Sequence, residues 1–287
     1  TATPLLLAGM GSIISERVGV FNISLEGAMN IGAFVGVVCV YYSAMPILGV
    51  LGAVVAGGLL ALIFILFVEF LHANETIAAI GVNTLSAGLT TFLAKMVFKE
   101  GVVGANKIVS IPSIRIPSLE QVPVLNTVLN NHTVLVYIAP LIVVALAFIL
   151  FRTAFGIKIR ASGENAMALE TAGVSSRKYR IVGVVSTGLL CGLAGAHVAL
   201  GYVSMFSEGL IAGRGYIAYS AAVFGRANPG LTSVACLIFA FAEALSYRSQ
   251  QIGISAQIIS MMPYIVTVAA LTIQGNNLRK SKLTAKG

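Results

Sequence analysis

The chain has 287 residues, of which 57% are hydrophobic and only 10% are charged, and its mean hydropathy is +0.95. So few charged residues do not cover the surface of a soluble enzyme, and the composition therefore predicts a membrane protein with a single domain over 1–287. The formal net charge of +8 does not indicate a partner nucleic acid, because the basic residues cluster at the edges of apolar segments.

Long segments without a charged side chain are the clearest feature of the sequence. No charged residue lies between Glu26 and Glu69. A helix rises about 1.5 Å per residue and about 20 apolar residues cross the hydrocarbon core, so this segment is long enough for two crossings. The pattern predicts an all-α fold, a polytopic transmembrane helix bundle of about 8–10 spans with broken or re-entrant helices. The predicted spans are 27–45, 47–68, 76–95, 133–151, 181–203, 231–247 and 256–274, after a partial span at 3–15, and the short stretch 209–226 is expected to cross or nearly cross.

The chain starts inside an apolar run, and we expect a further segment to precede it. The segment 14–27 is polar in apolar surroundings, and two interpretations of it stay open. In the first it is a short cytoplasmic turn, in which Asn22 or Ser24 caps the next helix and Glu26 lies in its first turn, where the helix dipole favours an acid. In the second it is a helix break at membrane depth, whose polar backbone lines a water-filled path.

A weak internal repeat favours the second interpretation. Phe21 and Phe34 recur at a constant offset as Phe206 and Tyr219, and each copy also carries a glutamate. Paired interrupted segments in the two halves of a membrane protein point to a binding site between them.

The distribution of basic residues predicts the orientation in the membrane. Cytoplasmic loops are rich in Lys and Arg. The basic loop, residues 152–180, and the tail 276–287 carry the densest basic clusters, so both are placed in the cytoplasm. The loop 96–132 mixes basic and acidic residues with Pro, Asn and Ser, and it is predicted to lie outside.

The basic loop is predicted to contain a short helix. Ser162 is a suitable cap, Glu164 would follow in the first turn, and Gly173 is a natural C-terminal stop. A helix of about two to three turns in a water-exposed loop is marginal by itself, so we expect a partner protein to bury it.

The run RASGENAMALETAG at 160–173 resembles the coupling loop of ABC importer permeases. Further likeness lies in 3–9, 15–27, 212–218 and 223–229. Together these segments resemble the permeases for branched-chain amino acids, simple sugars and nucleosides, and most closely the nucleoside branch, which depends on a basic membrane lipoprotein. Two features depart from the family: its first transmembrane helix is missing, and Asn22 stands where the sugar branch commonly has Asp.

The resemblance implies a non-enzymatic subunit that forms half of a pore in the bacterial cytoplasmic membrane, in contact with membrane lipid. The implied partners are an ATP-binding ABC subunit, a homologous or identical second permease subunit, and an extracytoplasmic substrate-binding lipoprotein. ATP and Mg²⁺ would bind to the ATPase, and no cofactor is expected in this chain. The residues implied in coupling to the ATPase are Ser162, Gly163, Glu164, Asn165, Ala168, Leu169 and Gly173.

The substrate path is predicted from polar and aromatic residues inside or beside the apolar spans. Asn83 is the strongest of them, because an amide in lipid needs hydrogen-bond partners. A nucleoside is neutral, hydroxylated and flat, so amides and aromatic rings suit it. The predicted path residues are Asn22, Asn30, Asn83, Phe21, Glu26, Phe206 and Phe224.

Other functions stay open at this point. The same ABC role is possible for simple sugars, branched-chain amino acids or a flavin vitamin. An ion-coupled secondary transporter would need a membrane-embedded acid such as Glu26, Glu69 or Glu243 as its carrier. The sequence has no phosphate-binding loop of the G-x-x-x-x-G-K-[ST] kind, and its cysteines lie in apolar runs without metal-ligand spacing.

Overall fold

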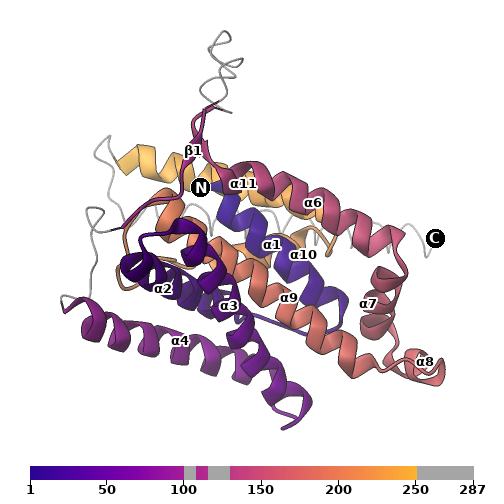
Figure 1. The fold of residues 1–287 in the computed structure, drawn as a ribbon. Coiled ribbons are helices and arrows are strands. Elements are labelled where there is room, and N and C mark those ends of the chain that lie inside the picture. Colours follow the sequence, from indigo (N-terminus) through magenta and orange to yellow (C-terminus); the bar gives the residue numbers. More distant parts are fainter. Residues whose placement is uncertain (100–107, 116–129, 251–287) are drawn as a thin grey trace.

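The computed structural model of this chain describes residues 1–99, 108–115 and 130–250 (Figure 1). These residues are helical apart from loops and one short antiparallel pair of strands, β1 (Ser113–Ile114) and β2 (His132–Thr133). The all-α prediction is therefore confirmed. Among the described helices, six are long and apolar enough to cross a membrane. They are α2 (Leu25–Ser43), α3 (Pro46–Glu69), α4 (Glu75–Phe98), α6 (Val134–Arg152), α9 (Ser176–Ala196) with its extension η3 (His197–Tyr202), and α11 (Pro229–Gln250).

These six spans agree with six of the predicted ones, because long charge-free runs are stable in lipid only as helices. The helices begin where the sequence offers a start signal. Pro46 stands at the first position of α3, where its missing N–H costs nothing. Asn74 caps α4 by accepting hydrogen bonds from the N–H groups of Thr76 and Ile77, at 3.0 and 3.2 Å.

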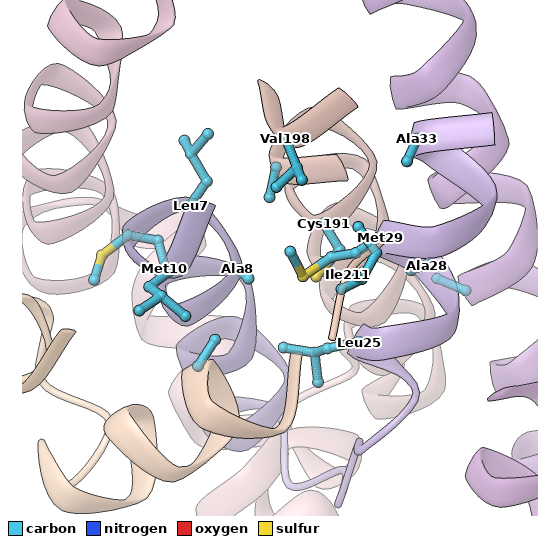
Figure 2. Packing of buried hydrophobic residues seen from close by; sticks show 14 of the residues in the cluster. Leu7, Ala8, Met10, Leu25, Ala28, Met29, Ala33, Cys191, Val198 and Ile211 are labelled. Atoms are coloured by element: carbon cyan, nitrogen blue, oxygen red, sulfur yellow. The ribbon is translucent and has the colours of Figure 1, made fainter. Parts of the chain in front are cut away.

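The central helix is α9, which packs against α1 (Ala2–Arg17), α2 and α3. Small residues allow this close approach: a Cβ added to Gly32 of α2 would lie 2.7 Å from the Cα of Gly192 in α9. Figure 2 shows Met29, Cys191 and Ile211 together in the buried core. Cys191 and Cys236 are both buried, as expected for core cysteines, and Cys39 is partly buried.

Each half of the bundle packs against the equivalent helices of the other half, and this arrangement supports the internal repeat. By the offset that makes Phe21 equivalent to Phe206, α1 to α3 correspond to the end of α9, α10 (Arg214–Phe224) and α11. Helix α1 packs against α9, α10 and α11, while α9 packs against α1, α2 and α3. The rings of Phe21 and Tyr219 lie 5.4 Å apart, and those of Phe34 and Phe206 lie 5.3 Å apart. Under the same offset Phe34 is equivalent to Tyr219, so the contact of Phe21 with Tyr219 is equivalent to the contact of Phe206 with Phe34. Two equivalent contacts of this kind are expected when two halves are related by a pseudo-twofold axis.

Of the two possibilities for 209–226, a full crossing is wrong. The segment 209–226 does not form a full crossing, because α10 has only 11 residues and is about 16 Å long. The chain leaves the π-helical η3 and reaches α10 through the irregular segment 203–213. The partial span is α1, a helix of 16 residues. The predicted span 256–274, the tail 276–287 and most of the outer loop 96–132 lie outside the described residues.

Candidate functional site

A cavity of about 220 Å³ lies between α2, α4 and the irregular segment before α10. At about 1.5 Å per residue, Asn83 and Thr90 lie about 12 and 22 Å along α4 from Glu75, its first residue. Since α4 has 24 residues, the cavity lies near the middle of this span. The lining residues are Glu26, Gly27, Asn30, Asn83, Ala87, Thr90, Thr91, Glu208, Gly209 and Ile211.

The carboxylate of Glu26 forms one wall of the cavity and caps the N-terminus of α10. Its Oε1 accepts a hydrogen bond from the N–H of Gly213 at 2.8 Å, and its Oε2 accepts one from Gly215 at 2.7 Å. Glu26 does lie in the first turn of α2, as the first interpretation of 14–27 expects, but its charge satisfies a different helix. The start of a helix has N–H groups without partners, and in a membrane no water satisfies them. Glu26 therefore joins the two halves of the bundle.

Asn83 ties α4 to the start of α2. Its Oδ1 accepts a hydrogen bond from the N–H of Gly27 at 2.8 Å, while its Nδ2 donates to the carbonyl of Ile23 at 2.9 Å and to the hydroxyl of Tyr216 at 3.1 Å. The expectation that this amide needs partners is met in full. One and two turns further along α4, Ser86 donates to the carbonyl of Gly27 and Thr90 accepts from Asn30, at 2.7 and 2.8 Å.

The cavity brings together three of the seven predicted path residues, Glu26, Asn30 and Asn83. It also includes Thr90, Thr91 and Glu208, which sequence reasoning missed. Thr90 could have been predicted, because Asn83, Ser86 and Thr90 are spaced three and four residues apart and so form a polar stripe on one face of a helix.

Asn22 does not line the cavity. It is buried in the turn between α1 and α2, where its Nδ2 donates to the hydroxyl of Ser15 at 3.2 Å. The same hydroxyl lies 2.7 Å from that of Thr187 on α9. The Oδ1 of Asn22 accepts from the N–H and the hydroxyl of Ser24, so neither residue caps α2 through its side chain, contrary to the first interpretation.

The three predicted aromatic residues also lie away from the cavity. Phe206 is 1% exposed and packs on Phe34, so its ring has no free face for a flat ligand. Phe21 is 44% exposed and packs edge-on against Tyr219. Phe224 packs against Phe239 at 5.9 Å.

The basic loop folds differently from the prediction. Its first half continues as α7 (Ala154–Glu164), so Ser162 and Glu164 belong to the end of that helix, and the hydroxyl of Ser162 donates to the carbonyl of Ile159 at 2.7 Å. The short helix is α8 (Ala166–Thr171), and Asn165 rather than Ser162 caps it, by accepting from the N–H of Ala168 at 3.0 Å.

The end of α8 does match the prediction. Gly173 has a φ of 77°, which favours glycine, and its N–H donates to the carbonyl of Glu170 at 2.9 Å. Val174 donates to Leu169 at 3.1 Å, which completes a Schellman motif. Leu169 is buried, whereas Ala168 is exposed. In Figure 1, α7 and α8 lie together at the end of the bundle where α9 begins.

Within the described ranges, no group of three or more metal-binding side chains is gathered at one point. A buried ion pair instead holds the start of α10, where Nη2 of Arg214 lies 2.7 Å from Oε1 of Glu243 on α11. The polar centre of the protein therefore combines hydrogen-bonding groups, the paired charges of Arg214 and Glu243, and the carboxylates of Glu26 and Glu208 in the cavity lining, which suits binding or passage of a polar solute.

Comparison with known proteins identifies the family. Residues 1–271 match the family described as branched-chain amino acid transport system, permease component. The chain is 37% identical over 286 residues to the guanosine ABC transporter permease protein NupQ of Bacillus subtilis, covering 94% of this chain and 88% of the relative. It is 31% identical to the nucleoside ABC transporter permease protein NupC of Lactococcus lactis, covering 95% and 89%.

A third relative is the putative glucose ABC transporter permease protein TsgC13 of Haloferax volcanii, at 31% identity over 94% of this chain and 88% of the relative. No solved structure matches this chain. The family match over nearly the whole chain and the six apolar spans lead to one conclusion. The chain belongs to the ABC transporter permeases of the branched-chain amino acid transport system family, and it is a multi-pass protein of the bacterial cytoplasmic membrane.

Proposed function

We propose that this chain is the permease subunit of an ABC importer for nucleosides and that the cavity beside Glu26 and Asn83 is part of the substrate path. The observation that carries the proposal is the position of this cavity, near the middle of α4 and between segments of the two related halves. The likeness to a guanosine permease and a nucleoside permease favours nucleosides as the cargo.

The chemistry of the cavity agrees with a neutral, hydroxylated solute. Amide and hydroxyl groups of Asn30, Asn83, Thr90 and Thr91 line it, and these groups both donate and accept hydrogen bonds. Simple sugars share this chemistry, and one relative is named as a putative glucose permease, so sugars are the second proposed cargo.

An ion-coupled secondary transporter is less well supported. A carrier acid has to bind and release a cation during transport. The three acids named as examples of such a carrier have fixed partners instead: Glu26 binds two backbone N–H groups, Glu69 pairs with Arg180 at 2.6 Å, and Glu243 pairs with Arg214.

The proposed mechanism is alternating access, powered from outside this chain. A separate ATPase subunit holds ATP and Mg²⁺, a second permease subunit completes the pore, and a lipoprotein delivers the solute from outside. Closure of the ATPase dimer moves α8 in the basic loop, and the permease helices then switch the opening of the path from one side to the other.

The direct test is uptake into proteoliposomes that contain this permease, the second permease, the ATPase and the lipoprotein. ATP-dependent accumulation of labelled guanosine, reduced by unlabelled adenosine but not by glucose, leucine or riboflavin, is the expected result. Accumulation of glucose but not guanosine would show that the cargo is a sugar rather than a nucleoside. Uptake driven by an ion gradient without the ATPase would overturn the ABC role.

The path assignment predicts that filling the cavity blocks transport. Ala87 is exposed and lines the cavity, and only its backbone carbonyl takes part in a hydrogen bond there, from the hydroxyl of Thr90 at 3.1 Å, so that its side chain can be exchanged. Ala87→Phe is expected to lower ATP-dependent uptake about tenfold or more, because the larger ring takes up space that the solute needs. Leu89→Phe is the matched control, since Leu89 is 40% exposed and does not line the cavity. Equal uptake in the two variants would remove this cavity from the path.

The docking assignment predicts that one exposed apolar side chain matters for assembly. Met167 on α8 is 76% exposed, in a loop that the charge pattern places in water. A minority of interface residues, near the centre of the interface, contribute more than about 1 kcal/mol each, and Met167 is the exposed large apolar side chain of α8, so Met167→Glu is expected to weaken ATPase binding about tenfold or more. Binding is measured by pull-down of the ATPase at varied concentration, with Lys178→Gln outside α8 as the control. Unchanged binding of the Met167 variant would contradict docking through α8.

A further inference from the structure

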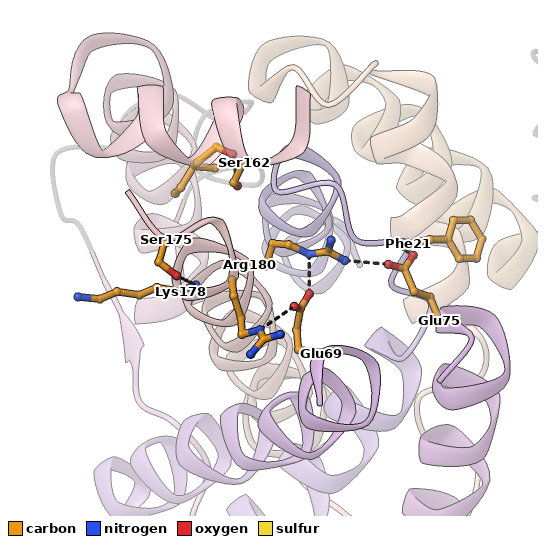
Figure 3. A network of polar contacts seen from close by, with 9 residues as sticks. Phe21, Glu69, Glu75, Ser162, Ser175, Lys178 and Arg180 are labelled. Atoms are coloured by element: carbon orange, nitrogen blue, oxygen red, sulfur yellow. Dashed lines mark hydrogen bonds and ion pairs between the residues drawn. The ribbon is translucent and has the colours of Figure 1, made fainter. Parts of the chain in front are cut away.

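At the cytoplasmic end of the bundle, one arginine joins three helices and a turn (Figure 3). Nε of Arg180, in α9, lies 2.6 Å from Oε1 of Glu69 at the end of α3. Its Nη2 lies 3.1 Å from Oε1 of Glu75 at the start of α4. The other oxygen of Glu75, Oε2, accepts a hydrogen bond from the backbone N–H of Phe21 at 2.8 Å. Glu75 is therefore shared between α9 and the turn that connects α1 to α2.

This cluster lies between the basic loop and the cavity. Arg180 is in the second turn of α9, directly after α8 and Gly173. Glu75 begins α4, which carries four of the cavity-lining residues, and Phe21 lies just before Glu26, which forms another part of the lining. The pair of Arg180 and Glu75 therefore links the first turns of α9 to α4 and, through the N–H of Phe21, to the turn that leads to Glu26.

A second contact ties the same turn to the basic loop itself. Gly163, at the end of α7, lies directly against the backbone of Arg17 and Gly19, and a Cβ added to it would be 2.7 Å from the N atom of Gly19. The turn 18–24 is therefore held at its beginning by α7 and near its middle by Glu75. Any shift of the basic loop relative to α4 has to change the position of this turn or break one of these contacts.

The environment makes the Arg180 contacts stronger than ordinary surface pairs. The side chains of Arg180, Glu69 and Glu75 are 26%, 10% and 28% exposed. Partly buried ion pairs are screened less by water and salt than exposed ones. Arg177 offers an internal comparison, because it also approaches Glu69, at 3.7 Å, but it is 53% exposed.

We propose that Arg180 and Glu75 are positioning residues that transmit the movement of the basic loop to α4 and to the turn 18–24, and so couple ATP hydrolysis to the opening of the cavity. This inference rests on the proposed ABC importer function. It assigns to these two residues a role in energy transfer that is separate from docking of the ATPase and from contact with the solute.

The test compares uptake with ATP hydrolysis in the reconstituted complex. Arg180→Gln and Glu75→Gln remove the charge pair, while Glu75→Gln keeps an oxygen for the N–H of Phe21. Each variant is expected to lower guanosine uptake about tenfold, because coupling free energies between sites typically correspond to about 5–150-fold effects. The rate of ATP hydrolysis is expected to stay within about twofold of the wild-type rate. The double variant is expected to be no worse than Arg180→Gln alone, because Arg180→Gln already removes the pair with Glu75 as well as the pair with Glu69.

Arg177→Gln is the matched control and is expected to transport at the wild-type ratio of solute to ATP. Thermal unfolding and pull-down of the ATPase show whether each variant is folded and assembled. The proposal is overturned if uptake and ATP hydrolysis fall in proportion, if the ATPase no longer co-purifies, or if the double variant shows additive losses. A wild-type complex without ATP-dependent uptake would instead overturn the proposed function, so the two failures are distinguishable.

Discussion

Replacing Glu26 with alanine is expected to destabilise the folded permease by about 3–6 kcal/mol and to abolish uptake. Hydrogen bonds to a charged group contribute about 1.5–3 kcal/mol each, and Glu26 accepts two of them, from Gly213 and Gly215. Without the carboxylate, the N–H groups of Gly213 and Gly215 at the start of α10 lose the acceptor that Glu26 provides in the cavity wall. The measurement is thermal unfolding of the detergent-solubilised complex, followed by uptake in proteoliposomes.

Two variants separate the capping role of Glu26 from a simple effect of cavity charge. Glu26→Gln keeps one acceptor oxygen and is expected to lose roughly half as much stability, because it replaces charged by neutral hydrogen bonds. Glu208→Gln changes another carboxylate in the same cavity, but this residue is exposed, so stability close to wild type is expected. If Glu26→Ala unfolds at the wild-type temperature, the capping role is wrong.

The lengths of the apolar spans were predictable, whereas the shortness of α10 was not. Each full span is a local property, since a charge-free run of sufficient length has to satisfy its own backbone as a helix. The run 209–226 has the same local character, yet only its second part is helical. Where α10 begins is set by Glu26, whose carboxylate comes from the other half of the chain. Gly213, the N-cap of α10 with a φ of 81°, is a local signal for this start, but nothing near it in the sequence shows which acid completes the cap.

The candidate site shows the same division between local and long-range information. Asn83 was predictable because an amide within an apolar run requires partners, and the structure supplies three. Phe206 was chosen for its ring, but packing against Phe34 encloses it. In the basic loop, Ser162 and Asn165 are both good caps by residue type, and only the extension of α7 through Glu164 decides between them.

The start of α10 is also held by the ion pair of Arg214 with Glu243 on α11, and breaking this pair is expected to destabilise the permease. Arg214 and Glu243 are 5% and 8% exposed, and their pair is separated along the chain by most of α10 and α11. Removing one partner of a buried pair typically costs about 3–5 kcal/mol, because the remaining charge loses its counter-ion in a medium that solvates it poorly. Glu243→Leu and Arg214→Met are each expected to destabilise the permease by about this amount, measured by thermal or denaturant unfolding of the solubilised protein.

The decisive variant combines both changes. Arg214→Met with Glu243→Leu removes the two charges together, and it is expected to be at least about 2 kcal/mol more stable than the sum of the single effects predicts. Arg177→Gln removes an exposed pair with Glu69 and is expected to change stability by less than about 1 kcal/mol. Additive losses in the double variant would show that Arg214 and Glu243 act separately. Coupled losses would mean that α10 is fixed through its backbone by Glu26 and through its first side chain by Glu243, so that the irregular segment 203–213 keeps its place in the cavity wall while the helices around it move.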